Sequence, residues 1–385
     1  MFLYAYQMEK KFGRLAATSP FPVSSRRGIE NYIAGLPFTL TEGQRNCIDA
    51  ILDEAETGKR IDCLIQADVG AGKTVIARSL CVAMASQGYQ SAILCPTTVL
   101  AKQHYEKISA DMEKIGIKTV LLISSMTRKK KRIALKMISE GERQIVIGTT
   151  SIIAKDVKYK KLALTVVDEE HRFGVKQREA LKLKGQFGIH SISLSATPIP
   201  RSLAICLYGD NTKIIDIKSM PAGRKTIKTM INNDTLKICK SINNQILQGH
   251  QCYIICPMID EAEEDSAVAN VASVEETYKA ITDIFEELNP KVKIEAISGK
   301  LKPKEIAEKM KRFEENEAQI LISTTIVEVG IDVPNATVMY IRSAERFGLA
   351  QLHQLRGRVG RGEAQSYCVL ESPNYDNARL KTMVK

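Results

Sequence analysis

The sequence lacks the long apolar runs and the targeting signals of proteins that enter or cross a membrane. No apolar run approaches the roughly 18–20 residues of a membrane span. The first ten residues, MFLYAYQMEK, do not join a basic start to a long apolar core, so they do not form a typical secretory signal. A cytoplasmic protein without a membrane partner is therefore expected.

The cysteine and histidine patterns that bind zinc are lacking as well. The chain has nine cysteines and five histidines, but they are scattered, and no C-x-x-C pair occurs. Structural zinc sites need such residues at close, regular spacing, so a zinc site is not expected. The cysteines are predicted to be reduced, several of them within apolar strands.

The composition is that of a folded protein with an excess of positive charge. Hydrophobic residues make up 44% of the 385 positions and charged residues 26%, which argues against disorder across the chain. This length suggests two domains. The 55 Lys and Arg outnumber the 44 Asp and Glu, which gives a net charge of +11. That balance permits a polyanionic partner without identifying one.

Short apolar runs alternate with longer amphipathic segments in both halves of the chain. Because the runs are apolar throughout, the strands are expected to be covered on both faces, as in parallel sheets. The sequence therefore predicts an α/β fold of two mostly parallel sheets, each with helices on both faces. The predicted strands are 62–66, 91–95, 119–123, 144–148, 163–167, 191–194, 251–256, 292–297, 319–323, 336–341 and 366–370, and the predicted helices include 74–87, 99–115 and 129–140.

Three segments lie outside this alternation. Residues 219–225 combine Pro and Gly with polar neighbours, which predicts a linker and a domain boundary near Gly223. Residues 260–265 hold five acids and are interpreted as a solvated loop or helix start. The basic run 128–132 can contact phosphates or form a solvated helix N-terminus, where its charges would oppose the helix dipole.

Residues 67–74, ADVGAGKT, follow an apolar run and open a helical segment, which is the context that a P-loop requires. Backbone N–H groups of such a loop surround the β-phosphate of ATP, and the next helix points its positive end at it. Lys73 is predicted to span the β- and γ-phosphates and Thr74 to hold Mg²⁺, although Ala67 replaces the usual first glycine. The predicted nucleotide-binding residues here are Asp68, Val69, Gly70, Ala71, Gly72, Lys73 and Thr74.

A second acidic motif follows a later strand. The run 163–167 delivers Asp168 at its carboxyl end, at the sheet edge where a P-loop also lies. Asp168 is predicted to bind Mg²⁺ through water. Glu169 is predicted to orient and polarise the attacking water.

Several motifs in this order resemble those of superfamily 2 helicases and translocases. DEEH at 168–171 resembles the DExH box, and SATP at 195–198 resembles motif III. PTTVLAKQH at 96–104 and GTT at 148–150 resemble motifs Ia and Ic. STTIVEVGIDVP at 323–334 and QLHQLRGRVGRG at 351–362 resemble motifs V and VI. The resemblance implies two RecA-like P-loop lobes over about residues 36–370.

Further segments are similar to the RecG and Mfd group within this superfamily. HRFGV at 171–175, TPIPRSL at 197–203 and ERFGLAQLHQ at 345–354 are shared features of the group, and LPFTLTEGQ at 36–44 and MPAGRK at 220–225 favour the RecG family. This resemblance implies an ATP-dependent DNA helicase that remodels forks and Holliday junctions. It divides the chain into a connector at 1–35, a first lobe at 36–222 and a second lobe at 223–385.

The resemblance also assigns roles in the second lobe. Arg358 and Arg361 are three residues apart, so on a helix they share one face and can both point at the γ-phosphate. Gln354 is implied to sense the nucleotide, and Gly330 and Asp332 to belong to the coupling loop. Gln44, before the P-loop, is implied to contact the adenine.

Motifs Ia, Ic and V are implied to track a DNA strand. Hydroxyl groups and backbone N–H groups suit phosphate contacts, which carry no base information, so binding is expected to be sequence-independent and salt-sensitive. The predicted DNA-binding residues are Thr97, Thr98, Gln103, Thr149, Thr150 and Thr324. A monomer associated with the bacterial nucleoid is expected.

Members of this family carry an N-terminal wedge and a C-terminal helical hairpin beyond the motor. Neither has room in this sequence, so the chain is expected to represent the motor alone, in a truncated form. Two alternatives remain: a remnant that binds nucleotide or DNA without productive unwinding, and an Mfd-like duplex translocase.

Overall fold

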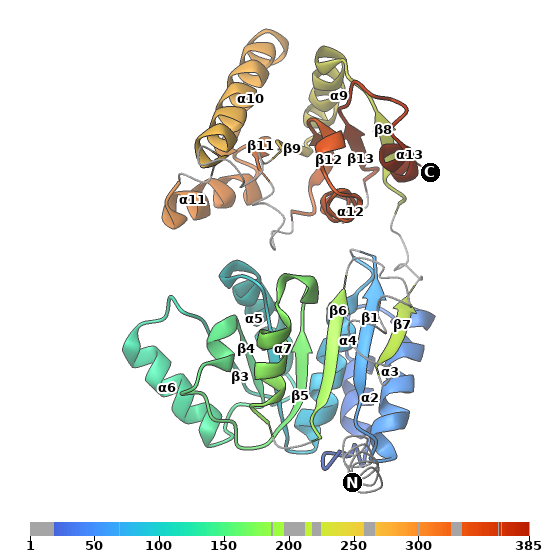
Figure 1. The fold of residues 1–385 in the computed structure, drawn as a ribbon, viewed down its shortest axis with the longest axis vertical. Coiled ribbons are helices and arrows are strands. Elements are labelled where there is room, and N and C mark those ends of the chain that lie inside the picture. Colours follow the sequence, from blue (N-terminus) through green and yellow to red (C-terminus); the bar gives the residue numbers. More distant parts are fainter. Residues whose placement is uncertain are drawn as a thin grey trace, which may run out of the picture. The chain divides into compact units, whose positions relative to one another are not determined.

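The computed structural model describes residues 19–68, 70–185, 188–195, 212–217, 225–257, 266–298, 301–324, 333–360, 362 and 364–384. The chain forms two compact units, Met1–Pro221 and Ala222–Lys385 (Figure 1). Several predicted features lie outside the described residues: connector residues 1–18, all of the linker 219–225 except Lys225, the acidic run 260–265, motif III beyond Ser195, and residues 325–332 of motif V.

The first unit is built on a seven-stranded sheet in the order β3-β4-β2-β5-β6-β1-β7, and all its neighbouring strands pair in parallel. Its strands are β1 (Asp62–Ala67), β2 (Gln90–Leu94), β3 (Thr119–Leu122), β4 (Ile145–Gly148), β5 (Leu162–Val167), β6 (His190–Ser195) and β7 (Lys213–Ile217). Strands β2, β4 and β5 are buried along their whole length, and β1 along all but its first residue, as apolar runs between two helical layers should be.

Helices cover both faces of this sheet (Figure 1). One hydrophobic core joins the strands to α2 (Arg27–Ala34), α3 (Glu42–Glu56), α4 (Lys73–Ser86) and α5 (Thr98–Glu113). A second core, on the opposite face, joins them to α6 (Arg128–Ser139), α7 (Val175–Lys182) and the 3₁₀ turn η1 (Thr150–Ile153).

The second unit repeats this architecture with a six-stranded parallel sheet in the order β10-β11-β9-β12-β13-β8. Its strands are β8 (Lys228–Ile231), β9 (Gln251–Ile255), β10 (Ile294–Ile297), β11 (Ile320–Ser323), β12 (Ala336–Ile341) and β13 (Tyr367–Leu370). On one face lie α9 (Thr235–Leu247) and α10 (Ser266–Leu288), and on the other α11 (Pro303–Glu314), α12 (Leu349–Arg356) and α13 (Ala378–Val384). The predicted fold class is confirmed in both units.

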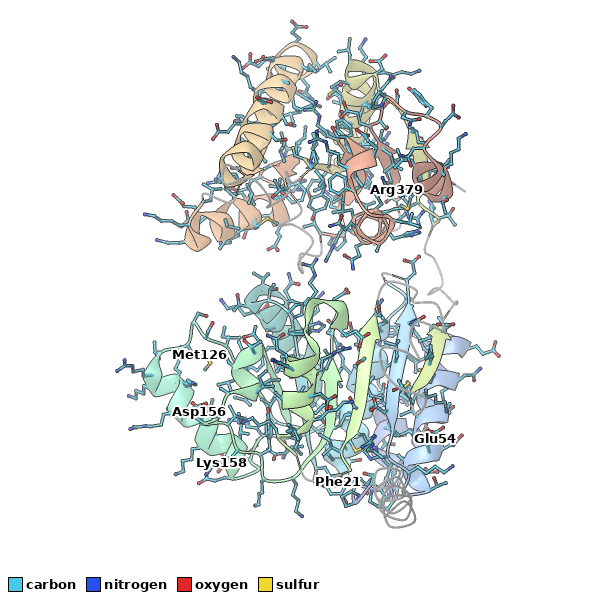
Figure 2. The ribbon with its side chains drawn as sticks, viewed as in Figure 1. Phe21, Glu54, Met126, Asp156, Lys158 and Arg379 are labelled. Atoms are coloured by element: carbon cyan, nitrogen blue, oxygen red, sulfur yellow. The ribbon has the colours of Figure 1, made fainter. Side chains whose placement is uncertain are left out.

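The segment that precedes the first sheet packs into the first unit from Ser19 onward. Phe21 is labelled in Figure 2 and is buried. Its ring lies edge-on to Tyr89, with 5.2 Å between ring centroids. Its carbonyl accepts a hydrogen bond at 2.9 Å from His190 Nε2, at the start of β6. Residues 19–35 therefore share the core of this unit, and the predicted boundary between connector and lobe at residues 35 and 36 stays a prediction.

The two units share a repeated turn after a central strand. After β5, Glu169 adopts a left-handed conformation with φ 50°, and the 3₁₀ turn η2 (Glu170–Arg172) follows. After β12, Ser343 adopts φ 47°, and the 3₁₀ turn η4 (Ala344–Arg346) follows. Each turn continues into the sequence F-G-x-x-Q, whose glutamine side chain accepts the glycine N–H at the start of the next helix. The sequence RFG that the halves share therefore forms the same local structure twice.

Candidate nucleotide and DNA site

The carboxyl edge of the first sheet gathers the predicted motifs. β1 leads into the P-loop, β5 into the DExH box, β2 into motif Ia and β4 into motif Ic. Because the strands are parallel, all four loops leave the sheet at the same edge, which is where ligands bind in open α/β sheets. The strand order puts β6 alone between β1 and β5.

The P-loop has the backbone that phosphate binding requires. Gly70 and Gly72 have φ angles of 81° and 83°, a region that side chains disfavour. Gly72 is the N-cap of α4, so the positive end of this helix faces the loop. The Lys73 ammonium group donates to the backbone oxygens of Ala67 at 2.6 Å and Asp68 at 3.1 Å, which keeps it over the loop. Val69 lies outside the described residues.

Gln44 packs against the back of the P-loop. It sits in the first turn of α3, where its side-chain oxygen accepts the Thr41 N–H at 2.9 Å and completes a capping box. Its Nε2 donates to the backbone oxygen of Ala71 at 2.8 Å, and the residue is 2% exposed. The structure therefore ties the predicted adenine-contact residue to the loop conformation.

Asp168 is held by hydrogen bonds on both carboxylate oxygens. Oδ1 accepts the Glu169 N–H at 3.1 Å, and Oδ2 lies 2.8 Å from His104 Nε2 on α5. Burial alone would raise the pKa of Asp168, but the His104 hydrogen bond, the Lys73 charge and the Glu169 N–H hold the pKa below the ordinary carboxyl value. Asp168 is thus an ionised carboxylate close enough to Lys73 to be stabilised by its charge.

The residues after Asp168 combine strain with burial. The left-handed backbone of Glu169 costs roughly 1–2 kcal/mol for a residue other than glycine, and such strain is concentrated at functional sites. Glu170 is fully buried, and its carboxylate pairs with Arg178 Nη1 at 3.4 Å. The side chain of His171 lies outside the described residues.

Thr74 and Asp168 have the chemistry that Mg²⁺ prefers. Both offer oxygen donors, one a hydroxyl and the other an ionised carboxylate, and Thr74 is partly exposed at the start of α4. In nucleotide sites Mg²⁺ takes one or two such protein oxygens together with phosphate oxygens. The described residues contain no group of three or more His, Cys, Asp or Glu that would hold a metal by themselves.

The structure corrects the helical argument for the two arginines of the second unit. The helix α12 ends at Arg356 and is capped by Gly357, and Gly360 has φ 77°. Arg358 therefore lies beyond the helix, and a shared helical face with Arg361 is wrong. Gln354 is on α12 and buried. Arg361, Gly330 and Asp332 lie outside the described residues.

The predicted DNA-binding residues differ in accessibility. Thr97 caps α5 by accepting the Leu100 N–H at 3.3 Å and is partly exposed, as are Thr98 and Gln103, while Thr150 is exposed at the start of η1. Thr149 and Thr324 are buried, at 8% and 3% exposure. Their hydroxyl groups therefore do not form an open phosphate-contact surface with the other four.

Sequence reasoning assigned no role to His104, which the structure places on Asp168. The two residues are 64 positions apart, and no spacing in the sequence relates them.

The membrane and cysteine predictions can be compared directly with the structure. None of the helices described is both long and apolar enough to cross a membrane, and the eight described cysteines are free and buried.

Two protein families match this chain. The DEAD/DEAH box helicase family matches residues 41–205, and the helicase conserved C-terminal domain matches residues 234–363. A solved structure of the helicase MrfA bound to DNA shares the fold, with a TM-score of 0.70 at 18% identity, over 96% of this chain and 54% of the other. The chain therefore has the two-lobe motor of the DEAD/DEAH box helicases.

Individual relatives narrow this class. The ATP-dependent DNA helicase RecG of Bacillus subtilis is 42% identical over 90% of this chain and 50% of its own length, and that of Thermotoga maritima is 41% identical over 89% and 43%. A structure of RecG bound to a three-way DNA junction aligns with a TM-score of 0.78 at 34% identity, over 98% of this chain and 49% of the other. The chain belongs to the RecG helicases and corresponds to their motor region, which is about half the length of these relatives.

Proposed function

We propose that this chain is an ATP-hydrolysing motor that moves on DNA, and that its activity is the RecG type, the remodelling of branched DNA. The observation that carries the proposal is the carboxyl edge of the first sheet. There the P-loop follows β1 and the DExH aspartate follows β5, with β6 alone between the two strands, and the next residue, Glu169, has a left-handed backbone. The 42% identity to a RecG helicase and the fold shared with a junction-bound RecG support the choice of substrate.

In this proposal, the first unit holds Mg·ATP. The backbone N–H groups of 70–72 and the Lys73 ammonium group bind the phosphates, and the Thr74 hydroxyl and the Asp168 carboxylate hold Mg²⁺. Bound Mg²⁺ would neutralise charge on the phosphate oxygens. Gln44 fixes the loop through the Ala71 oxygen and is proposed to contact the adenine.

Glu169 is proposed as the residue that orients the attacking water and accepts its proton. The backbone of Glu169 is left-handed immediately after Asp168. In this proposal the two neighbouring carboxylates have different roles: Asp168 binds the metal and Glu169 acts on the water. Arg358 and Arg361 of the second unit are proposed to stabilise charge in the transition state. Gln354 is proposed to sense the nucleotide, and Gly330 and Asp332 to belong to the coupling loop of the nucleotide site.

DNA contacts are proposed at Thr97, Thr98, Gln103 and Thr150, all of which are accessible in the first unit. Thr149 and Thr324 are proposed to act through backbone N–H groups, because their side chains are buried. The proposed state is a monomer that works on nucleoid DNA in the bacterial cytoplasm.

The proposal is tested by measuring ATP hydrolysis with and without DNA. We expect wild-type turnover to rise with DNA and to fall at least about 100-fold in Lys73→Ala and Glu169→Gln. Glu179→Gln is the matched control, because it makes the same change at an exposed position of α7 and should keep wild-type turnover. Wild-type turnover in Lys73→Ala or Glu169→Gln would refute the catalytic assignment.

Substrate choice is tested by comparing stimulation by a three-way junction, a linear duplex and RNA. We expect the junction to stimulate ATP hydrolysis at least as strongly as the duplex, and RNA to stimulate it least. A preference for the linear duplex over the junction would favour an Mfd-like translocase, and a preference for RNA would refute the DNA assignment.

A further inference from the structure

The helix α5 connects the proposed DNA contacts to both nucleotide motifs of the first unit. Thr97 and Thr98, at its N-terminus, are proposed DNA contacts, and His104, in its second turn, bonds to Asp168. Seven residues further on, Asp111 Oδ2 accepts a hydrogen bond of 2.9 Å from Arg78 Nη1 on α4, the helix that begins at Lys73. Residues seven apart are two helical turns apart, so His104 and Asp111 lie on the same face of α5.

Asp168 receives its second hydrogen bond from a different element than its first. Oδ1 is held by the N–H of the next residue, which moves with Asp168 itself. Oδ2 is held by His104, whose side chain is only 12% exposed, like that of Asp168 at 13%. The His104 bond is therefore a nearly dry contact that fixes the carboxylate relative to α5.

We propose that His104 is a positioning residue that holds the metal-binding carboxylate of Asp168 in a fixed position relative to α5. In this proposal it acts through Asp168 and not by contact with nucleotide or DNA. A polynucleotide that shifts the N-terminus of α5 would move His104 and so change how Asp168 presents its oxygens, and Mg·ATP would in turn favour one position of α5. The inference rests on the proposed function, because it assigns a metal to Asp168 and DNA to Thr97 and Thr98.

The test measures the Mg²⁺ concentration needed for half-maximal binding of a fluorescent ATP analogue, without hydrolysis. His104→Asn removes the bond, since the shorter amide cannot reach Asp168, and we expect it to raise this concentration about tenfold, as loss of a second-layer hydrogen bond to a metal ligand does. His104→Gln places an amide nitrogen near the position of Nε2, and we expect it to stay within about twofold of wild type.

The two variants differ by one methylene group, so a general loss of packing would affect both. Glu106→Gln, on the exposed side of the same helix, is the control and should match wild type. A wild-type midpoint in His104→Asn would overturn the inference, and so would equal shifts in His104→Asn and His104→Gln. A wild-type chain that binds no Mg·ATP would overturn the proposed function as well, which distinguishes the two failures.

A second measurement tests the link to DNA. We expect linear duplex DNA to change the Mg²⁺ midpoint of wild type and His104→Gln, and to leave that of His104→Asn unchanged. DNA that binds wild type and His104→Asn equally but shifts neither midpoint would overturn the coupling.

Discussion

At the scale of single residues, Gly72 sets the shape of the P-loop. Its φ of 83° costs a residue with a side chain roughly 1–2 kcal/mol, and a Cβ atom there would overlap the Gln44 amide. We expect Gly72→Ala to weaken ATP binding about tenfold or more, because each 1.4 kcal/mol is a factor of ten. Gly88→Ala is the control, since Gly88 has φ 79° but no atom within 4 Å of an added Cβ. Equal ATP affinity in both variants would contradict this reading.

His190 makes the stability of the first unit depend on pH. Its Nδ1 accepts the Ile61 N–H at 3.2 Å and its Nε2 donates to the Phe21 oxygen, so the buried ring is neutral. Burial lowers the pKa of His190, so the unfolded chain takes up its proton at a higher pH than the folded one. Its contribution to stability is therefore complete above the ordinary histidine pKa of about 6.5 and is lost as the pH falls below it.

We expect the urea midpoint of the wild type to fall between pH 7.5 and pH 5. His190→Leu should have a lower midpoint at pH 7.5, because it loses both hydrogen bonds, and a weaker dependence on pH. An unchanged pH dependence in His190→Leu would show that other groups cause it.

Residue-scale chemistry was predictable from the sequence where it is local. The P-loop and the DExH box are contiguous, so their residue types and flanking runs were enough to place Lys73 and Asp168 at one edge of the sheet. Contacts between distant segments were not predictable. The pairing of His104 with Asp168 follows from the order of the strands, which no single stretch of sequence contains.

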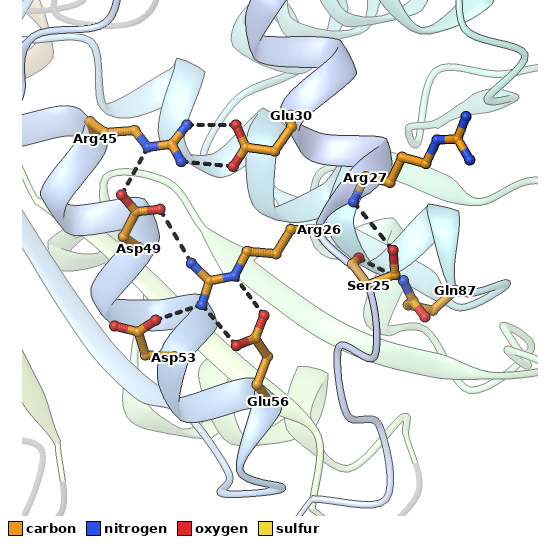
Figure 3. A network of polar contacts seen from close by, with 9 residues as sticks. All are labelled: Ser25, Arg26, Arg27, Glu30, Arg45, Asp49, Asp53, Glu56 and Gln87. Atoms are coloured by element: carbon orange, nitrogen blue, oxygen red, sulfur yellow. Dashed lines mark hydrogen bonds and ion pairs between the residues drawn. The ribbon is translucent and has the colours of Figure 1, made fainter.

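At the scale of elements, an ion-pair network joins α2 to α3 (Figure 3). Arg26, the N-cap of α2, pairs with Asp49, Asp53 and Glu56 on α3, and Arg45 of α3 pairs with Glu30 of α2. These side chains are 25–68% exposed, so solvent and salt screen the attraction. Each pair is thus worth at most about 1 kcal/mol.

We expect Arg26→Met to lower the stability of the first unit by about 1 kcal/mol at low salt, because it leaves three carboxylates near one another. The methionine keeps the apolar stem and removes the charge. The difference from wild type should shrink in about 1 M NaCl, where the Debye length is about 3 Å. A loss of stability that salt does not change would indicate packing instead.

The strands that the sequence failed to predict are edge strands. β7 and β8 end their sheets, and their sequences KIIDI and KTMI carry charged residues with partly exposed positions. Charges at a sheet edge oppose unwanted pairing, but they also remove the continuous apolar run that identifies a central strand. The end of α12 was also misjudged: the helix is capped at Gly357, before Arg358, so helical spacing does not apply to this arginine.

At the scale of the whole molecule, the number of units and the fold class followed from the order of the motifs and the apolar runs. The structure and the RecG structure with which it aligns confirm the fold class. The net charge of +11 did not identify a binding surface by itself, because many surface cations have no specific partner. The exposed start of α6, which carries Arg128, Lys129 and Lys130, illustrates this, since it suits either solvent or phosphate.

The salt dependence of DNA binding distinguishes these uses of the charge. A chain whose Lys and Arg side chains neutralise about five phosphates, in addition to the neutral contacts, should show a slope of about −4.5 in log affinity against log salt, or a loss of about 500-fold between about 50 and 200 mM. We expect this slope for two duplexes of equal length and different sequence, because contacts through threonines and backbone N–H groups do not read bases.

Lys129→Gln with Lys130→Gln should reduce the slope by about 2 if α6 contacts phosphates and leave it unchanged if these lysines are only solvated. The affinity for ATP, measured in the same salt series, should change far less, because the P-loop binds a single nucleotide through backbone N–H groups and Lys73. A flat salt dependence or a strong preference for one duplex would contradict a motor that follows the DNA backbone.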